Sequence, residues 1–429
     1  MQRRFRASAL AALVVSALLV PAALAAPVEV AHASGKLDRV STVAAYSWWS
    51  GPLAASSAST GNVYFTAVTH QGKQRVYRVK NGRVDYVSVG NVTADDHSAP
   101  ALSIWPGKPT IVVRTAHPGV MYVSTTRHLS KIKTGAASPF SKARKIPFGG
   151  LKTSYAQILR DGDRVVVLTR AGTAYDWYEV SSPDSGLTWT PPVRVLDAEG
   201  RQSYLLLRPS ESDALRYHAV AYGHPKYGAE NRIGYRELTF DDLWAGTVRD
   251  LRLGQFEEVV AAGDPNDDDP PAQHDLDGNV IIDANSLRLF DVVDVDGEPV
   301  VAYASWSVAR SEVIYRLARR TEDGTWKRST VAGAGGGFGA GSAKYVPGML
   351  FDTRPDHDVV YYGYAAADAS GWALASRSLE PGSTSEVIAT SPRILARPQQ
   401  LGDSRLLVQE IANYVTYRNF RIGVSILQG

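Results

Sequence analysis

Four side chains in the first half of the chain belong to residue types that carry proton transfer and anion binding. His97 and His117 lie 20 residues apart, and we expect them at matching points of neighbouring strands. Tyr155 and Arg170 flank a turn at 161–163, so one hairpin would bring both to the same side. His or Tyr acts as base or acid when its pKa lies near the working pH, and Arg binds a carboxylate through two donors. The set is suited to moving a proton beside a carboxylate.

The segments that must position these residues have the pattern of short β-strands. From residue 60 onward, β-branched and aromatic runs alternate with Gly, Asn, Asp and Pro turns, and helical spacing is not sustained. A looser repeat, spaced like propeller blades, begins near residues 61, 97, 153, 203, 285, 345 and 392. We predict an all-β fold, a single β-propeller over residues 40–429 with seven blades, although six or eight would also fit. Residues 40–55 would close the ring beside the last blade, which removes exposed sheet edges.

The clearest marker of the repeat is an eight-residue turn, S-P-D-S-G-L-T-W at 182–189. It fits the Asp-box pattern S-x-D-x-G-x-T-W, in which the Asp accepts turn hydrogen bonds, the Gly permits positive φ and the Trp packs beneath the hairpin. The segment E-D-G-T-W at 322–326 is a degraded second copy. Asp boxes are structural, so these turns support the propeller and predict no particular reaction.

Residues 1–33 have the composition of a secretory signal peptide. Three arginines precede an apolar run, and small-residue sites predict cleavage near residue 25 or 33. The alternative interpretation is an N-terminal membrane anchor. We therefore expect a secreted, extracellular protein that has no membrane contact after cleavage.

Charge and cysteine content exclude several kinds of partner. The net charge is +3, and removal of the three arginines in the signal leaves a nearly neutral chain, so we expect no nucleic-acid partner. The absence of cysteine excludes a disulfide framework and a thiolate metal site. We expect a monomer that requires no cofactor.

The acidic run at 264–270, followed by His274, Asp275 and Asp277, offers ligands for a structural Ca²⁺. It lacks the spacing of a calcium loop, so a solvated acidic loop is the favoured interpretation.

The order of several short motifs resembles the BNR-repeat (Asp-box) propeller family that includes ulvan lyases and related polysaccharide lyases. The resemblance covers about 48–365 of the sequence. Its motifs are, in order, G-N-V-Y at 61–64, D-D-H-S-A-P at 95–100, R-T-A-H at 114–117, S-Y at 154–155, L-T-R at 168–170, the Asp box, Y-G-H-P at 222–225 and F-D-V at 290–292. In that family the substrate lies across one mouth of the propeller, and the reaction is β-elimination next to a uronic acid.

The resemblance implies a role for each candidate residue. Arg170 would neutralise the uronate carboxylate, and His97 and Tyr155 would form the acid–base pair, in an order that remains open. Four further residues would bind substrate or orient the pair: His117, His224, Asn62 and Tyr222. The implied protein is a secreted lyase acting on an acidic, ulvan-like polysaccharide of rhamnose and uronate. The alternatives are a propeller glycoside hydrolase, rhamnosidase-like or sialidase-like, and a carbohydrate-binding propeller without catalysis.

Overall fold

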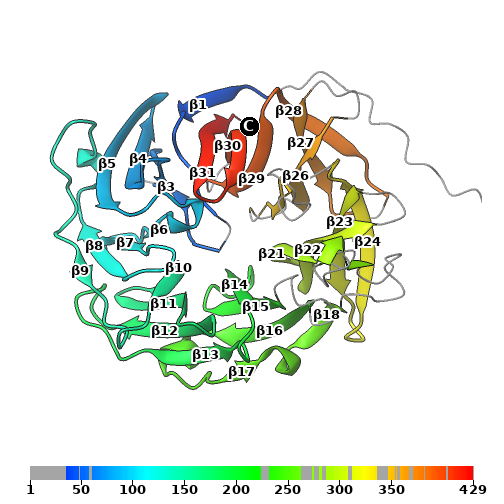
Figure 1. Cartoon of the computed structure of the whole chain (residues 1–429), viewed down its shortest axis with the longest axis horizontal. Coiled ribbons are helices and arrows are strands. Elements are labelled where there is room, and N and C mark those ends of the chain that lie inside the picture. The colour runs from blue at the N-terminus through cyan, green and yellow to red at the C-terminus, as the bar shows by residue number, and fades with distance from the viewer. Residues whose placement is uncertain are drawn as a thin grey trace, which may run out of the picture.

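The computed structural model describes residues 35–428. The description excludes residues 48, 58–59, 224–230, 262–272, 275–279, 283–286, 308–311, 336–345, 353, 355–357, 367–370, 381 and 402–403. The predicted signal peptide at 1–33 therefore lies outside the described residues. Seven sheets of mainly antiparallel strands lie side by side around a central axis (Figure 1), so the prediction of an all-β, seven-bladed propeller is confirmed. In the described part of the chain, no helix has the length and apolar character needed to cross a membrane.

Within each blade the strands follow one another outward from the axis. Blade 1 consists of β2 (Ala54–Ser56), β3 (Val63–Val68), β4 (Lys73–Lys80) and β5 (Arg83–Asn91). Blade 2 consists of β6 (Ala101–Ser103), β7 (Thr110–Arg114), β8 (Tyr122–Thr126) and β9 (Arg144–Lys145). Blade 3 consists of β10 (Thr153–Asp161), β11 (Arg164–Ala171), β12 (Asp176–Ser182), β13 (Val193–Asp197) and the short parallel β17 (Leu251–Arg252).

The second half of the ring follows the same plan. Blade 4 consists of β14 (Ser203–Pro209), β15 (Arg216–Gly223), β16 (Arg232–Thr239) and β18 (Glu257–Ala261). Blade 5 consists of β21 (Arg288–Val295), β22 (Glu298–Ser307), β23 (Glu312–Arg320) and β24 (Trp326–Gly333). Blade 6 consists of β25 (Met349–Phe351), β26 (Val359–Ala365), β27 (Trp372–Ser378) and β28 (Ser385–Ser391). In the described chain, two connections between blades contain further elements: η1 (Asp96–Ser98) between blades 1 and 2, and the hairpin of β19 (Gln273–His274) and β20 (Val280–Ile282) between blades 4 and 5. Within blades, η2 (Leu129–Lys131) connects β8 to β9, and α1 (Phe240–Trp244) and η4 (Leu253–Gln255) lie between β16 and β18.

Blade 7 joins the two ends of the described chain. It consists of β29 (Ile394–Gln400), β30 (Leu406–Thr416), β31 (Asn419–Leu427) and, as its outermost strand, β1 (Leu37–Ser41). The ring is thus closed from the N-terminal side as predicted, but by 37–41 rather than 40–55. Arg39 of β1 pairs with the buried Glu410 of β30, which holds this strand on the blade. Residues 54–56 instead begin blade 1, so the first repeat starts before residue 61.

Burial explains why the inner strands are continuous apolar runs. All six residues of β3 are buried, because both of its faces pack against neighbouring blades. The third strand, β4, mixes buried and partly exposed positions and is fully exposed only at its two ends. Tight turns join the hairpins: Asn81 and Gly82 have φ values of 49° and 73°, and Asp296 and Gly297 have 55° and 82°. Two consecutive positive φ values suit the twist of a β-hairpin, and they explain the Asn-Gly and Asp-Gly pairs.

The Asp-centred turn at 182–189 connects the third and fourth strands of blade 3. Asp184 Oδ1 accepts hydrogen bonds from the backbone N–H groups of Leu187 and Thr188 at 2.9 and 2.8 Å. Gly186 has a φ of 88°, and Trp189 packs against the hydrophobic core between blades 2 and 3. The weaker turn at 322–326 has the same place in blade 5, between β23 and β24. Both turns stabilise the outer part of a blade, far from the axis.

Candidate active site

The two ends of the innermost strands define two different mouths of the propeller. We call the mouth where these strands begin the site mouth, and the mouth where they end the opposite mouth. The opposite mouth holds a cavity of about 540 Å³ whose wall includes Ser56, Trp105, Arg160, Pro209 and Gln400. His97 in η1 precedes β6 and Tyr155 begins β10, while His117 follows β7 and Arg170 lies near the end of β11. Innermost strands start, and second strands finish, at the same mouth, so these four side chains gather there.

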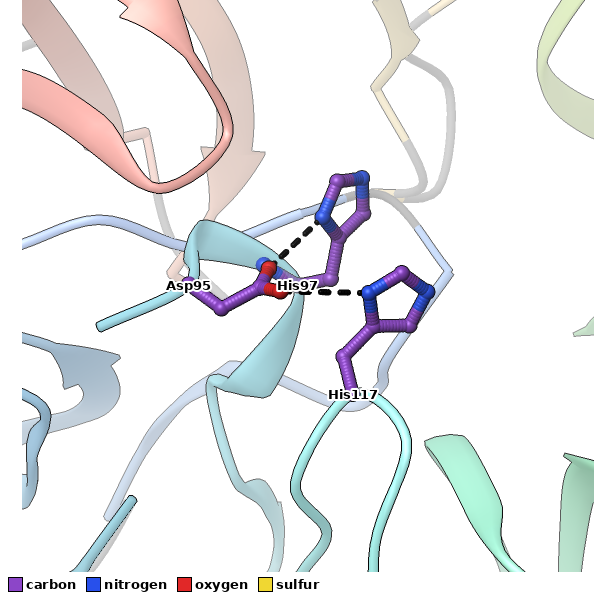
Figure 2. Close-up of side chains that lie close together, drawn as sticks. All are labelled: Asp95, His97 and His117. Carbon is purple, nitrogen blue, oxygen red and sulfur yellow. Dashed lines mark hydrogen bonds and ion pairs between the residues drawn. The ribbon is translucent and has the colours of Figure 1, made fainter. Parts of the chain in front are cut away.

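Asp95 links the two histidines (Figure 2). His97 Nδ1 lies 2.8 Å from Asp95 Oδ1, and His117 Nδ1 lies 3.2 Å from Asp95 Oδ2. The two imidazole rings stack, with centroids 4.6 Å apart. An ionised carboxylate only accepts hydrogen bonds, so each Nδ1 carries a proton and each Nε2 of a neutral ring keeps its lone pair. Asp95 therefore orients both histidines so that Nε2 is the nitrogen without a proton.

The charges within this cluster shift two pKa values. Burial alone would raise the pKa of Asp95, but hydrogen bonds from His117 and His97 outweigh it and hold the pKa at about 2. Burial lowers the pKa of His117, and the nearby His97 and Arg170 lower it further, against the opposing effect of Asp95. At neutral pH, Asp95 is therefore an anion and His117 a neutral ring.

This shift predicts how the protein responds to acid. The folded pKa of Asp95 is depressed, so its contribution to stability is fully present above the ordinary pKa of 3.8 and is lost as the pH falls towards about 2. At pH 3 we expect a loss of about 1 kcal/mol from this group. Urea unfolding at pH 6 and pH 3 measures it: Asp95→Asn should lose less stability between the two pH values than the parent protein. An equal loss in both proteins would show that Asp95 is not the titrating group.

Tyr155 has an unusual backbone conformation. Its φ is 63°, and the register between β10 and β11 breaks between Ser154 and Gln157. A bulge of this kind re-aims a side chain, and positive φ in a bulky residue costs energy that a functional site can justify. The Tyr155 ring lies 5.7 Å from the His97 ring and 5.5 Å from the His117 ring. The bulge thus directs Tyr155 towards the histidine pair.

Arg170 is a buried cation. Its side chain is 2% exposed, and its guanidinium carbon lies 4.8, 5.2 and 4.9 Å from the ring centroids of Tyr155, Tyr175 and Tyr204. Its Nη2 donates to His117 Nε2 at 3.2 Å, and the Tyr204 side chain also interacts with the guanidinium. No Asp or Glu of the described residues forms an ion pair with it. Buried charges are normally paired, so this arrangement leaves a place for an external anion.

A pocket of about 670 Å³ opens above these residues. Its described lining includes three cations, Lys152, Arg170 and Arg418, and contains no acidic residue. His117 and Tyr175 also face it, whereas Tyr155 is only 1% exposed and forms the layer beneath. The charge of the lining favours an anionic ligand.

Part of the pocket wall comes from the last blade, and the sequence did not predict it. Tyr417 and Arg418 form the turn between β30 and β31 and line the pocket. The Tyr417 ring lies edge-on to the rings of His97 and His117, at 5.3 and 6.0 Å. Arg418 Nε lies 3.9 Å from Asp95 Oδ2. No sequence motif marks this turn; only the closure of the ring brings residue 417 next to residue 97.

Of the predicted site residues that the structure describes, His117 and Arg170 belong to the pocket lining, whereas His97, Tyr155, Asn62 and Tyr222 do not. Asn62 lies at the opposite mouth, where its buried amide donates to Tyr64 Oη at 3.2 Å, because it precedes the second strand of its blade. Tyr222 is fully buried, accepts a hydrogen bond from Arg288 at 3.1 Å and stacks on Trp49, so it supports the site from below. His224 lies outside the described residues. The acidic run at 264–270 lies outside them too.

Asp95, His97 and His117 are the described residues that could hold a metal ion. One potential ligand atom from each lies within 4.8 Å of the others. Two imidazoles and one carboxylate suit Zn²⁺, whereas Ca²⁺ requires six to eight oxygen ligands. Both Nδ1 atoms already form hydrogen bonds with Asp95, so a metal bound through them would have to displace the two Nδ1 protons.

Comparison with known proteins shows the fold. No known family profile matches the chain, and no curated protein matches it. Among solved structures, a PL25 polysaccharide lyase, an ulvan lyase bound to -[GlcA(1-4)Rha3S]-, aligns with a TM-score of 0.60, over 92% of this chain and 96% of that one. The chain has the fold of an ulvan lyase.

The sequences themselves are distant. Identity to that ulvan lyase is 11%. The polysaccharide lyase Uly1 aligns at 9% identity and a TM-score of 0.45, over 93% of this chain and 99% of that one. An endo-arabinase from Bacteroides thetaiotaomicron aligns at 10% identity and a TM-score of 0.37, over 81% and 95%. Propellers of one fold carry many functions, so the chemistry must be argued from the residues of this chain.

Proposed function

We propose that the protein is a secreted polysaccharide lyase that cleaves an acidic, ulvan-like polysaccharide by β-elimination beside a uronic acid. The observation that carries the proposal is Arg170, a buried guanidinium that has no acidic partner among the described residues and lies at the base of a cationic pocket. A uronate carboxylate would supply the missing anion. The Asp-centred turns at 182–189 and 322–326 support a place in the BNR-repeat family.

The reaction requires a proton to leave C5 and the C4–O bond to break, which leaves a double bond between C4 and C5. Arg170 neutralises the carboxylate, which makes the C5 proton more acidic. His97 removes that proton through Nε2, because Asp95 holds its Nδ1–H and stabilises the imidazolium that forms. Tyr155 protonates the leaving oxygen, and the Arg170 guanidinium 4.8 Å from its ring stabilises the phenolate that remains. His117 connects Asp95 to Arg170 and orients both.

The arrangement of carboxylates disfavours hydrolysis. A glycoside hydrolase normally uses two carboxyl groups about 5–10 Å apart on either side of the glycosidic bond, one of them protonated. Among the described residues the pocket lining has no Asp or Glu. Asp95 and Asp96, the carboxylates next to His97, are both buried and bound to their neighbours, and the Asp95 pKa of about 2 prevents it from acting as an acid. Elimination uses the groups that are present.

A panel of uronate polysaccharides, with and without rhamnose, tests the proposal through the ultraviolet absorbance of the 4,5-unsaturated uronate. We expect absorbance to rise with at least one polysaccharide that alternates rhamnose and uronate, and not with neutral glycans. New reducing ends without absorbance would indicate a hydrolase. Saturable binding without either product would indicate a carbohydrate-binding propeller.

Removal of divalent metal should leave the reaction intact. In the proposed mechanism the positive charge comes from Arg170, and Asp95 is occupied by two histidine protons. We therefore expect dialysis against EDTA to change turnover by less than about twofold. A large loss that Zn²⁺ restores would instead assign Asp95, His97 and His117 as metal ligands.

A further inference from the structure

A fully buried ion pair, formed by Asp96 and Arg397, lies next to His97. Asp96 and Arg397 are 0% and 1% exposed, and Arg397 Nη1 lies 2.8 Å from Asp96 Oδ2. Asp96 precedes His97 in η1, between blades 1 and 2, whereas Arg397 lies in β29, the innermost strand of blade 7. The pair therefore joins two parts of the chain that meet only when the ring is closed.

Asp96 Oδ2 and the Asp96 backbone N–H hold the segment that carries His97 against blade 7, whereas Oδ1 has no hydrogen-bond partner among the described residues. Its Oδ2 also accepts a hydrogen bond from Tyr414 Oη at 3.0 Å, and its Oδ1 lies 3.0 Å from His97 Nδ1. Its backbone N–H donates to the carbonyl of Tyr417 at 2.9 Å. Asp96 is thus fixed by blade 7 on one side and contacts the imidazole on the other.

Arg397 is equally constrained from its own side. Its Nη1 also donates to the carbonyl of Tyr46 at 2.6 Å, and Tyr46 Oη donates back to the carbonyl of Arg397 at 3.0 Å. Its φ is 51°, and the register between β29 and β30 breaks between Ala396 and Gln399. Tyr46 follows the ring-closing strand β1. The bulge and these hydrogen bonds tie Arg397 to the segment that enters the ring from β1.

The burial of these two charges costs free energy. Removal of both ions from water costs more than their attraction returns unless their geometry is well satisfied, and apolar residues of similar volume are often equally stable. We propose that the Asp96–Arg397 pair is a positioning device that fixes the imidazole of His97 and couples the active site to ring closure. This role rests on the proposed function of His97 as the base.

The test compares two similar Asp–Arg–Tyr clusters. In the first cluster, Asp96 contacts Arg397 and Tyr414. In the second, Asp352 contacts Arg354 and Tyr361. Asp352 follows the end of an innermost strand, so the second cluster lies towards the opposite mouth. We expect Asp96→Asn to lower kcat by about 10- to 100-fold with KM within about twofold, because a small displacement of a reacting group has an effect of this size. Asp352→Asn should lower the unfolding temperature but leave kcat per folded molecule unchanged. Equal kcat per folded molecule in the two variants would overturn the proposal.

Two additions keep the test decisive. If Asp96→Asn does not fold, Tyr414→Phe removes one hydrogen bond to Asp96 without leaving a buried charge unpaired. It should lower kcat at constant KM, and Tyr361→Phe should not; equal kcat in these two would also contradict the proposal.

The ¹⁵N signals of His97, assigned with His97→Gln, report on the ring independently of turnover. They should shift in Asp96→Asn and not in Asp352→Asn, even if the parent protein forms no unsaturated product and the proposed function fails. Unchanged signals would refute the positioning role alone.

Discussion

Replacement of Arg170 by Gln should reduce kcat/KM by about 10²–10³-fold or more, the usual effect of removing a group that stabilises developing charge. The buried guanidinium is the group that would neutralise the uronate carboxylate, and Gln cannot supply its charge. Arg170→Lys keeps the charge but loses the planar fork that binds a carboxylate through two hydrogen bonds, so it should recover only part of the activity. Initial rates of unsaturated-uronate formation measure both variants.

Arg114 provides a matched control for Arg170. Arg114 is the last residue of β7, and Arg170 lies near the end of β11, so both occur at the end of a second strand. The Arg114 guanidinium also stacks on a tyrosine, Tyr122, at 4.9 Å. It does not belong to the described pocket lining. Arg114→Gln should therefore leave kcat/KM within about threefold of the parent value. Near-normal activity in Arg170→Gln, or an equal loss in both variants, would contradict the role of Arg170.

Replacement of His97 by Gln should lower kcat by about 10²–10⁴-fold, the range expected for loss of a general base. Gln fills a similar space but cannot accept the C5 proton. Substrate binding should persist, because Arg170 and the rim of the pocket are unchanged. Isothermal titration with an oligosaccharide measures the binding, and the absorbance assay measures kcat.

Substitutions of two other histidines serve as comparisons for His97→Gln. His117→Gln should weaken both binding and turnover, because His117 connects Asp95 to Arg170. His70 lies in the exposed turn between β3 and β4, at the site mouth but outside the described pocket lining, and His70→Gln should have no effect. Retention of kcat in His97→Gln would exclude His97 as the base and leave His117, which lines the pocket, as the candidate imidazole.

The propeller could be predicted because its rules are local. Continuous apolar runs mark inner strands, alternating runs mark outer strands, and pairs such as Asn81-Gly82 mark the hairpins between them. The gathering of His97, His117, Tyr155 and Arg170 follows from the same repetition, because the start of an innermost strand and the end of a second strand always face one mouth. The order of residues within a blade was enough for these four.

Contacts between distant parts of the chain could not be predicted in the same way. Tyr417 and Arg418 reach the site only through ring closure, and so does the Asp96–Arg397 pair. The bridge from Asp95 to two imidazoles depends on side-chain direction, which spacing does not reveal. Asn62 was assigned to the substrate by its motif, yet its place before a second strand puts it at the opposite mouth.

The ratio of double bonds to new reducing ends tests the central claim most directly. The purified protein is incubated with a polysaccharide of alternating rhamnose and uronate, and absorbance and reducing ends are followed in the same sample. Elimination creates one unsaturated uronate for each bond broken, so the account predicts that the two quantities rise in equal amounts and that both vanish in Arg170→Gln. Reducing ends that accumulate without ultraviolet absorbance would contradict it.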